Sequence, residues 1–348
     1  MPPAPAMRGL TAAWLERGFL ARLLWPLSLL YGVAWRLHCA LYRLGWRRSE
    51  RLPVPVVVVG NLIAGGAGKT PTVMAIIELL RGAGRVPGVV SRGYGRREAA
   101  LREVDAASDA RDVGDEPLLI HLRTRAPVSV GRERAAAAHR LLQRHPEVDV
   151  IVADDGLQHL ALARDAAVLV FDERGAGNGW LLPAGPLREP LPDAVPAASL
   201  VLYNAGAPST SLPGHLATRA LAGVASLGDW WAGAAPSSDA LGRLAGRPLV
   251  AAAGLARPQR FFDLLRTAGL TFDALPLPDH FAFDALPWRA GTADVVLTEK
   301  DAVKLRPERL HALAGGAPPR VWVAALDFRP DAAFASALTA LLPRMNRA

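Results

Sequence analysis

The sequence has almost no cysteine: Cys39 is the one thiol among 348 residues. A single cysteine cannot form an intrachain disulfide, which excludes a small secreted fold held by disulfide bonds and favours a reducing compartment. Hydrophobic residues make up 51% of the chain and charged residues 21%. This composition is typical of globular domains rather than disordered chains, and the length allows two domains.

Long hydrophobic runs are also missing. Near the N-terminus, 13 uncharged residues separate Arg22 from Arg36, and Pro26 interrupts them. A membrane-spanning helix needs about 20 apolar residues, and no small-residue cleavage site follows, so neither a span nor a signal peptide is favoured. Arginines and tryptophans between Leu20 and Trp46 instead predict a helix pair lying among lipid headgroups. The alternative is a helix packed on the main domain with its arginines in solvent, and both can hold on different faces.

Net positive charge is small outside this segment. Residues 1–52 contain eight arginines and two glutamates, a net charge of +6, whereas the whole chain carries +8. The difference, 8 minus 6, leaves +2 for the remaining residues. A basic surface of the kind that binds nucleic acid is therefore not supported, and we expect no nucleic-acid partner.

Lysine is rare in this chain. Lys69, Lys300 and Lys304 are the only lysines among 40 basic residues. In so arginine-rich a chain, a lysine is a candidate for a role that a compact ammonium fills better, such as binding phosphates. Chance is the alternative explanation, and it weighs more for Lys304 than for Lys69.

The rest of the chain alternates expected strands and helices. We expect strands at 54–59, 86–90, 148–155, 166–172 and 198–204, with helices at 72–81 and 133–144. A proline-rich loop follows at 183–196, and the pattern restarts after about residue 235, with strands near 247–255, 293–298 and 320–326 and helices near 258–269 and 299–305. This order predicts an α/β fold with a mostly parallel, doubly wound sheet. The expected units are an N-terminal amphipathic helical segment (1–52), a main domain (53–235) and a smaller α/β domain that contributes to the active-site cleft (236–348).

The stretch "GNLIAGGAGKTPTV" (60–73) follows the first expected strand and opens the first helix. A strand, a glycine-rich loop and Lys-Thr at a helix start are the context of a phosphate-binding loop, so the main domain is predicted to be P-loop NTPase-like. Ile63 occupies the position of the usual first glycine, and a plain glycine-rich turn is the alternative. The predicted ATP-binding residues are Ile63, Ala64, Gly65, Gly66, Ala67, Gly68, Lys69 and Thr70.

Two aspartates end the expected strand "VDVIVADD" (148–155). A parallel sheet places its ligands at the carboxyl ends of its strands, so Asp154 and Asp155 are candidates to hold Mg²⁺ together with the Thr70 hydroxyl. Two solvated turn aspartates are the alternative.

Seven short motifs occur together and in order from residue 60 to 305. They are the loop above, "SRGYGR", "GDEP", "DDGLQH", "GNGWLLPAGPLREP", "PDH" and "LTEKDAVKL". The set resembles the tetraacyldisaccharide 4'-kinase family of lipid A biosynthesis in Gram-negative bacteria. The resemblance implies ATP and Mg²⁺ as cofactors and transfer of the γ-phosphate to the 4'-hydroxyl of a tetraacyldisaccharide 1-phosphate. It also implies peripheral or monotopic attachment to the cytoplasmic face of the inner membrane.

The resemblance further implies a catalytic base. It assigns this role to Asp115 of "GDEP", with His280 of "PDH" orienting it or sharing its proton. From the residues alone, an Asp-Glu pair before Pro117 is more often the start of a helix, and a lone histidine is more often structural. We also expect the C-terminal unit to close over the loop and to bring His280 to Asp115.

The remaining motif residues are expected to contact the substrate or to support the site. These are Arg92, Tyr94, Glu116, Gln158, His159, Asn178 and Arg188, of which Gln158 and His159 are expected beside the two aspartates. The chain departs from the family at Ile63 and Ala67, where small hydroxyl residues are common, and at Phe281, where relatives often have a second histidine.

Two other functions share part of this evidence. A membrane-associated P-loop ATPase that acts as a switch would explain the loop and the N-terminal segment but not the Asp115 and His280 motifs. A GTPase is less favoured, because "TEKD" (298–301) only loosely resembles a guanine-reading motif.

Overall fold

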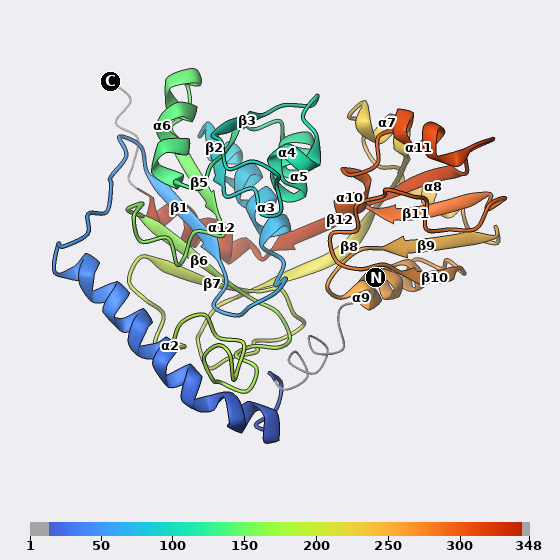
Figure 1. The fold of residues 1–348 in the computed structure, drawn as a ribbon. Coiled ribbons are helices and arrows are strands. Elements are labelled where there is room, and N and C mark those ends of the chain that lie inside the picture. The colour runs from blue at the N-terminus through green and yellow to red at the C-terminus, as the bar shows by residue number, and fades with distance from the viewer. Residues whose placement is uncertain (1–13, 343–348) are drawn as a thin grey trace.

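The computed structural model describes residues 14–342 (Figure 1). The elements of its first part, in chain order, are α2 (Phe19–Arg43), β1 (Val56–Gly60), α3 (Lys69–Gly82), β2 (Pro87–Ser91), β3 (Arg102–Val104), α4 (Ala110–Val113), α5 (Asp115–Thr124), β4 (Val128–Val130), α6 (Arg134–Arg144), β5 (Val150–Asp154), β6 (Ala166–Phe171) and β7 (Ser199–Tyr203).

The second part continues this sheet. Its elements are β8 (His215–Ser226), α7 (Leu227–Trp231), α8 (Ser238–Gly242), β9 (Leu249–Ala253), α9 (Pro258–Thr267), β10 (Asp273–Pro276), β11 (Asp294–Thr298), α10 (Glu299–Ala302), α11 (Pro307–Ala314), β12 (Arg320–Pro330) and α12 (Ala332–Leu341). Within the described residues the strands follow the order β10-β9-β11-β12-β8-β7-β6-β1-β5-β2-β4-β3.

The central strands are parallel and buried on both faces. β1 lies between β5 and β6, and it pairs with both in parallel. Because side chains alternate along a strand, Val57 and Val59 pack in the cluster that contains α3 and α5. Val56 and Val58 pack in the opposite cluster, which contains α6. Helices therefore cover both faces, as the predicted doubly wound fold requires.

Two long antiparallel strands connect the halves of the sheet. β8 has 12 residues and β12 has 11, and in Figure 1 both run from the main part of the molecule to the lobe that carries β9, β10 and β11. The sequence did not predict β8, because "HLATRALAGVAS" shows no clear apolar alternation, and it ended β12 at residue 326 instead of Pro330. The predicted unit boundaries near residues 52 and 235 stay a prediction, and residues 1–13 and 343–348 lie outside the described chain.

Between Leu20 and Trp46, where the sequence predicted a helix pair, the structure has the single helix α2. α2 continues through Pro26, although proline removes one backbone hydrogen bond. Ser28 donates to the carbonyl of Leu181 at 2.8 Å, and Tyr31 donates to the carbonyl of Arg188 at 2.6 Å. This side of α2 thus packs on the main domain, which confirms the alternative for this face. Within residues 14–342 no helix is long and apolar enough to cross a membrane.

Candidate active site

The glycine-rich loop joins the buried strand β1 to the start of α3. Gly65 and Gly68 adopt φ angles of 92° and 91°, in the left-handed region that favours glycine. Gly68 is the N-cap of α3, which begins at Lys69 rather than at the predicted residue 72. The backbone amides at this end of the helix, with its positive dipole end, are suited to an anion.

Ile63 is a structural anchor of the loop. Its side chain is fully buried in the cluster on the α6 side of the sheet, and it forms a β-bridge with Leu187. The amide of the next residue, Ala64, donates to the carbonyl of Pro186 at 2.7 Å. The loop therefore makes its turns at Gly65 and Gly68, and its first position is free to hold an apolar residue. Ala67 is buried as well.

Lys69 points toward the carboxyl end of the sheet. Its Nζ donates to Oδ1 of Asn61 at 3.2 Å and lies 3.6 Å from Oδ1 of Asp155. Thr70, the second residue of α3, is 9% exposed. The lysine, the threonine and the aspartate predicted from distant motifs thus lie at one edge of the sheet.

The two aspartates differ in surroundings. Asp154, at the end of β5, is buried; its Oδ2 accepts from Ser91 at 3.0 Å, and its Oδ1 has no partner among the described residues. Burial, followed by the charges of Glu116 and Asp155, raises the pKa of Asp154 to about 7. Asp155 has a φ angle of 51° and pairs with Lys69 and with Arg188, 3.1 Å away.

This donor set is compatible with Mg²⁺. No group of three or more His, Cys, Asp or Glu suited to a metal occurs within residues 14–342. Mg²⁺ at nucleotide sites binds through one or two carboxylates plus phosphates, so a protein-only cage is not required. A buried carboxylate with one unpartnered oxygen, next to a second aspartate, supplies ligands of the kind that Mg²⁺ uses.

Asp115 and His280 are in direct contact, although 165 positions separate them. Nδ1 of His280 lies 2.8 Å from Oδ2 of Asp115, which is buried at the start of α5. Burial would raise the pKa of Asp115, but the hydrogen bond from His280 and the charge of Lys300 outweigh it and lower the pKa. The hydrogen bond to Asp115 raises the pKa of His280 against burial and Lys300. The contact exists in this structure, and the predicted closure of the C-terminal unit stays a prediction.

Lys300 joins the second lobe to this pair. Its Nζ donates to Oε1 of Glu116 at 3.0 Å and lies 3.7 Å from Oδ1 of Asp279. Burial would lower the pKa of this lysine, but the carboxylates of Glu116, Asp115 and Asp279 raise it well above its usual value. The lysine therefore stays charged and holds Glu116 beside Asp115.

Two residues of the loop after β2 reach the opening of the site. Tyr94 is 71% exposed, and its ring centroid lies 5.9 Å from that of His280. Arg92 is exposed in the same loop.

Burial, followed by the charges of Arg134 and Arg92, lowers the pKa of His159 to about 4, which makes that imidazole neutral at physiological pH.

The proline-rich loop supports the site from the side of α2. Arg188 reaches the site through its ion pair with Asp155. Gln158 donates to Glu189 of this loop at 2.7 Å and to the carbonyl of Asn61, after β1, at 3.4 Å, so neither hydrogen bond goes to the two aspartates. Asn178 is buried and donates to the carbonyl of Ala184 at 2.9 Å, which places it inside the loop as a structural residue.

The chain is similar over nearly its whole length to proteins of a known family. The family model described as LpxK, tetraacyldisaccharide-1-P 4'-kinase, matches residues 20–343. This chain belongs to that family. The tetraacyldisaccharide 4'-kinase of Methylibium petroleiphilum is 58% identical over 99% of this chain and 96% of its own length. That of Leptothrix cholodnii is 57% identical over 95% of this chain and 94% of its own length.

A solved structure of the tetraacyldisaccharide 4'-kinase family has the same fold. The "apo" form of LpxK from Aquifex aeolicus, crystallised in complex with ATP, matches with a TM-score of 0.74 and 25% identity, over 93% of this chain and 100% of that one. The predicted family, the α/β fold and the ATP-dependent kinase activity are confirmed. The switch-ATPase and GTPase interpretations are thereby set aside.

Several side chains at the active site of this kinase were not predicted from the sequence. Asn61, Arg174, Asn204 and Ser91 contact the loop or Asp154, and Arg134 is buried beside the aspartates. The first four immediately follow or end a strand, or lie within three residues of its end, at the carboxyl edge of the sheet. That position is the signal that could have found them.

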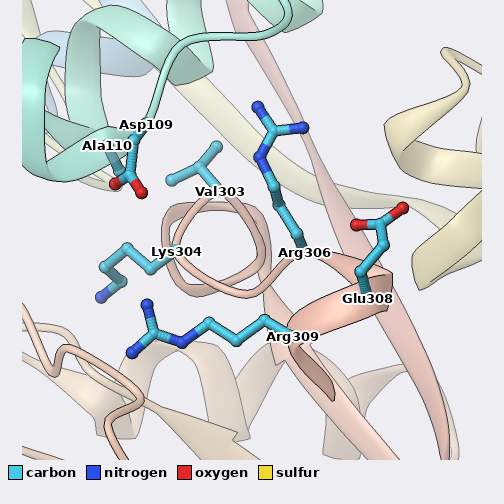
Figure 2. A pocket seen from close by; sticks show the side chains of 7 residues that line it. All are labelled: Asp109, Ala110, Val303, Lys304, Arg306, Glu308 and Arg309. Atoms are coloured by element: carbon cyan, nitrogen blue, oxygen red, sulfur yellow. The ribbon is translucent and has the colours of Figure 1, made fainter. Parts of the chain in front are cut away.

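A cavity of about 230 Å³ lies between the lobes beside Asp109, Lys304 and Arg309 (Figure 2). Its basic side chains have partners. Lys304 pairs with Asp301, Arg309 pairs with Asp284, and Arg306 donates to the carbonyls of Ala106 and Ser108. Lys304 therefore pairs within the second lobe, outside the nucleotide site.

Proposed function

We propose that this chain transfers the γ-phosphate of ATP to the 4'-hydroxyl of a tetraacyldisaccharide 1-phosphate, with Asp115 as the base, at a membrane surface. The observation that carries the mechanism is the contact of His280 with Asp115 next to a phosphate loop. Family membership supplies the reaction and its place in lipid A biosynthesis.

The loop side of the site binds the nucleotide. Amides of residues 65–68 and the start of α3 surround the phosphates, and Lys69 neutralises charge that develops on the transferred group. Thr70, Asp154 and Asp155 would hold Mg²⁺, which when bound neutralises phosphate charge. Lys69 and Arg188 then have anionic partners other than Asp155, the carboxylate that both contact in this structure.

The opposite side activates the acceptor. The 4'-hydroxyl must lose a proton as the phosphoryl group arrives, and Asp115 accepts it. A carboxylate with a lowered pKa is a weak base, so the protonation state of His280 matters. Nδ1–H of His280 donates to Oδ2 and orients the carboxylate, and neutral His280 leaves Asp115 a stronger base than charged His280 does. Lys300 keeps Glu116 in place beside this pair. Arg92 and Tyr94 are exposed and would contact the sugar or its phosphate.

The exposed face of α2 is the proposed membrane contact. With 3.6 residues per turn, Phe19, Leu23, Leu30 and Leu37 share one face and are 61–83% exposed, while Ser28 lies on the opposite, packed face. In Figure 1 this helix runs along the outside of the main domain. An apolar helix face flanked by arginines inserts at the headgroup boundary of anionic lipid. Because ATP is the phosphate donor, the proposed location is the cytoplasmic face of the inner membrane.

The deciding experiment follows radioactive phosphate from [γ-³²P]ATP to tetraacyldisaccharide 1-phosphate in detergent micelles. The unaltered protein should label the lipid, and Lys69→Ala and Asp115→Ala should both reduce the labelling sharply. ATP hydrolysis without labelled lipid would show that the acceptor is wrong. Equal labelling by the parent and Asp115→Ala would remove Asp115 as the base.

A further inference from the structure

The carbonyl oxygens of the phosphate loop are bound from outside by side chains. Arg174 donates from Nη1 to the oxygen of Ala64 at 3.2 Å and from Nη2 to the oxygen of Gly66 at 3.0 Å. Asn61 donates to Gly65 at 3.0 Å, and Asn204 donates to Ala67 at 3.0 Å. Four consecutive peptide oxygens, from residue 64 to residue 67, thus each accept a hydrogen bond from a side chain.

This arrangement matters because a peptide unit is rigid. When its oxygen is fixed on one side, its N–H group points to the other, and the anion in a phosphate loop is bound by such N–H groups. Backbone oxygens that face away from the ligand still need donors. In this chain the loop begins with the buried Ile63 instead of a glycine, and the external donors set the direction of the peptides that follow it.

Arg174 is itself fixed by a buried carboxylate. Asp172, which follows β6, is fully buried, and Nε of Arg174 lies 3.0 and 3.1 Å from its two oxygens. Burial would raise the pKa of Asp172, but the hydrogen bond and charge of Arg174 lower it, so the carboxylate is ionised. A Cβ added at Gly65 would lie 3.2 Å from Nη1 of Arg174, which shows how closely the guanidinium approaches the loop.

We propose that Arg174 is a positioning residue for ATP: its planar guanidinium, held by Asp172, orients the peptides of Ala64 and Gly66 so that the loop amides face the phosphates. The inference rests on the proposed binding of ATP by this loop and adds a residue outside the loop motif. Arginine is required because one planar group must donate in three directions, to Asp172, Ala64 and Gly66.

The test compares Arg174→Met with Arg257→Met. Arg257 also lies beside Asp172, 3.7 Å away, and it pairs with Glu173 rather than with the phosphate loop. Loss of two charge-assisted hydrogen bonds should raise the KM for ATP and the Kd of a fluorescent ATP analogue about tenfold in Arg174→Met. The KM for the lipid should stay within twofold, and Arg257→Met should resemble the parent in both constants. Guanidinium ion added to Arg174→Ala should restore part of the ATP affinity.

The outcomes separate this inference from the proposed function. If Lys69→Ala leaves ATP binding unchanged, the loop is not the ATP site and the proposed function fails. If Lys69→Ala weakens binding while Arg174→Met and Arg257→Met behave alike, the inference alone is overturned. Should Arg174→Met fail to fold in a thermal melt, Arg174→Lys decides instead. Its single ammonium keeps the charge beside Asp172 but cannot donate in all three directions, so an unchanged KM for ATP would overturn the inference.

Discussion

The two sides of the active site are encoded in different ways. The phosphate side is continuous in sequence, because residues 60–70 supply the loop, its lysine and its threonine. The acceptor side is assembled from distant segments: Asp115 begins α5, His280 follows β10, and Lys300 lies in α10 of the other lobe. A local motif can be identified from its spacing, whereas a contact across 165 positions depends on the whole sheet having formed. Variants of the two sides should therefore affect different kinetic constants.

Asp115→Asn should give the largest effect among these tests. The amide keeps the size of the side chain but cannot accept the proton, so kcat should fall about 10³-fold. The KM for ATP should stay within twofold, because the loop is untouched. Steady-state kinetics with both substrates gives the two constants. A tenfold rise in the KM for ATP would contradict the separation of the two sides.

Lys300→Met should have a smaller effect on the same side. It leaves the carboxylates of Glu116 and Asp279 without their shared cation, and a lost charge-assisted hydrogen bond is expected to lower kcat about 30-fold. Lys304→Met is the matched control, because it removes the same charge from the same lobe, but Lys304 pairs with Asp301 and not with Glu116 or Asp279. Equal losses in the two variants would mean that Lys300 acts only through the stability of the second lobe, which thermal melting would show.

The comparison also explains what could be predicted from the sequence. Apolar runs such as 54–59 and 166–172 indicated the central strands, since a strand that is buried on both faces is apolar at consecutive positions. The strand β8 was missed because its alanines, glycine and threonine give no periodicity, and its pairing with β12 decides its structure. The Asp115–His280 contact was expected only from the family resemblance, because short motifs do not encode a distance in space.

The residues around the phosphate loop also could not be predicted from sequence motifs alone. Asp172 and Arg174 are an ordinary acidic and basic residue after a strand, and nothing in their spacing relates them to residues 64 and 66. Asn178 and Gln158 were expected to contact the substrate or to support the site, and their hydrogen bonds to Ala184 and Glu189 of the proline-rich loop are of the supporting kind. A motif thus marks a region, and only the packed structure separates residues that face the ligand from residues that support the loop.

The two faces of α2 also differ, because one packs on the main domain and the other is exposed. Leu30 lies on the exposed face and is 67% exposed, and it should insert among lipids if this face binds a membrane. Leu30→Gln removes the transfer free energy of one apolar side chain, so binding to vesicles of anionic phospholipid should weaken about tenfold. Sedimentation with vesicles measures it. Val86→Gln, at an exposed apolar residue before β2, is the control and should bind as the parent does.

The acid limb of the pH profile should show the smallest change. The hydrogen bond to Asp115 raises the pKa of His280 above its usual value of 6.5, so His280 becomes neutral, and leaves Asp115 the stronger base, only above that pH. We therefore expect kcat/KM to fall as the pH drops through a value above 6.5. The stabilising contribution of the charged pair has the opposite dependence: it is complete below the unfolded pKa and is lost as the pH rises through the folded pKa.

Lys300→Met tests whether His280 controls the acid limb, because it should shift the limb in a known direction. The charge of Lys300 lowers the pKa of His280, so its removal should move the acid limb to higher pH. Rate profiles for the parent and the variant between pH 5.5 and 9 measure the shift, with Lys304→Met as the control. An unmoved limb, or one displaced to lower pH, would mean that a group other than His280 controls the rate. His280→Gln should then retain the limb, and the base would have to be sought among the carboxylates on the phosphate side.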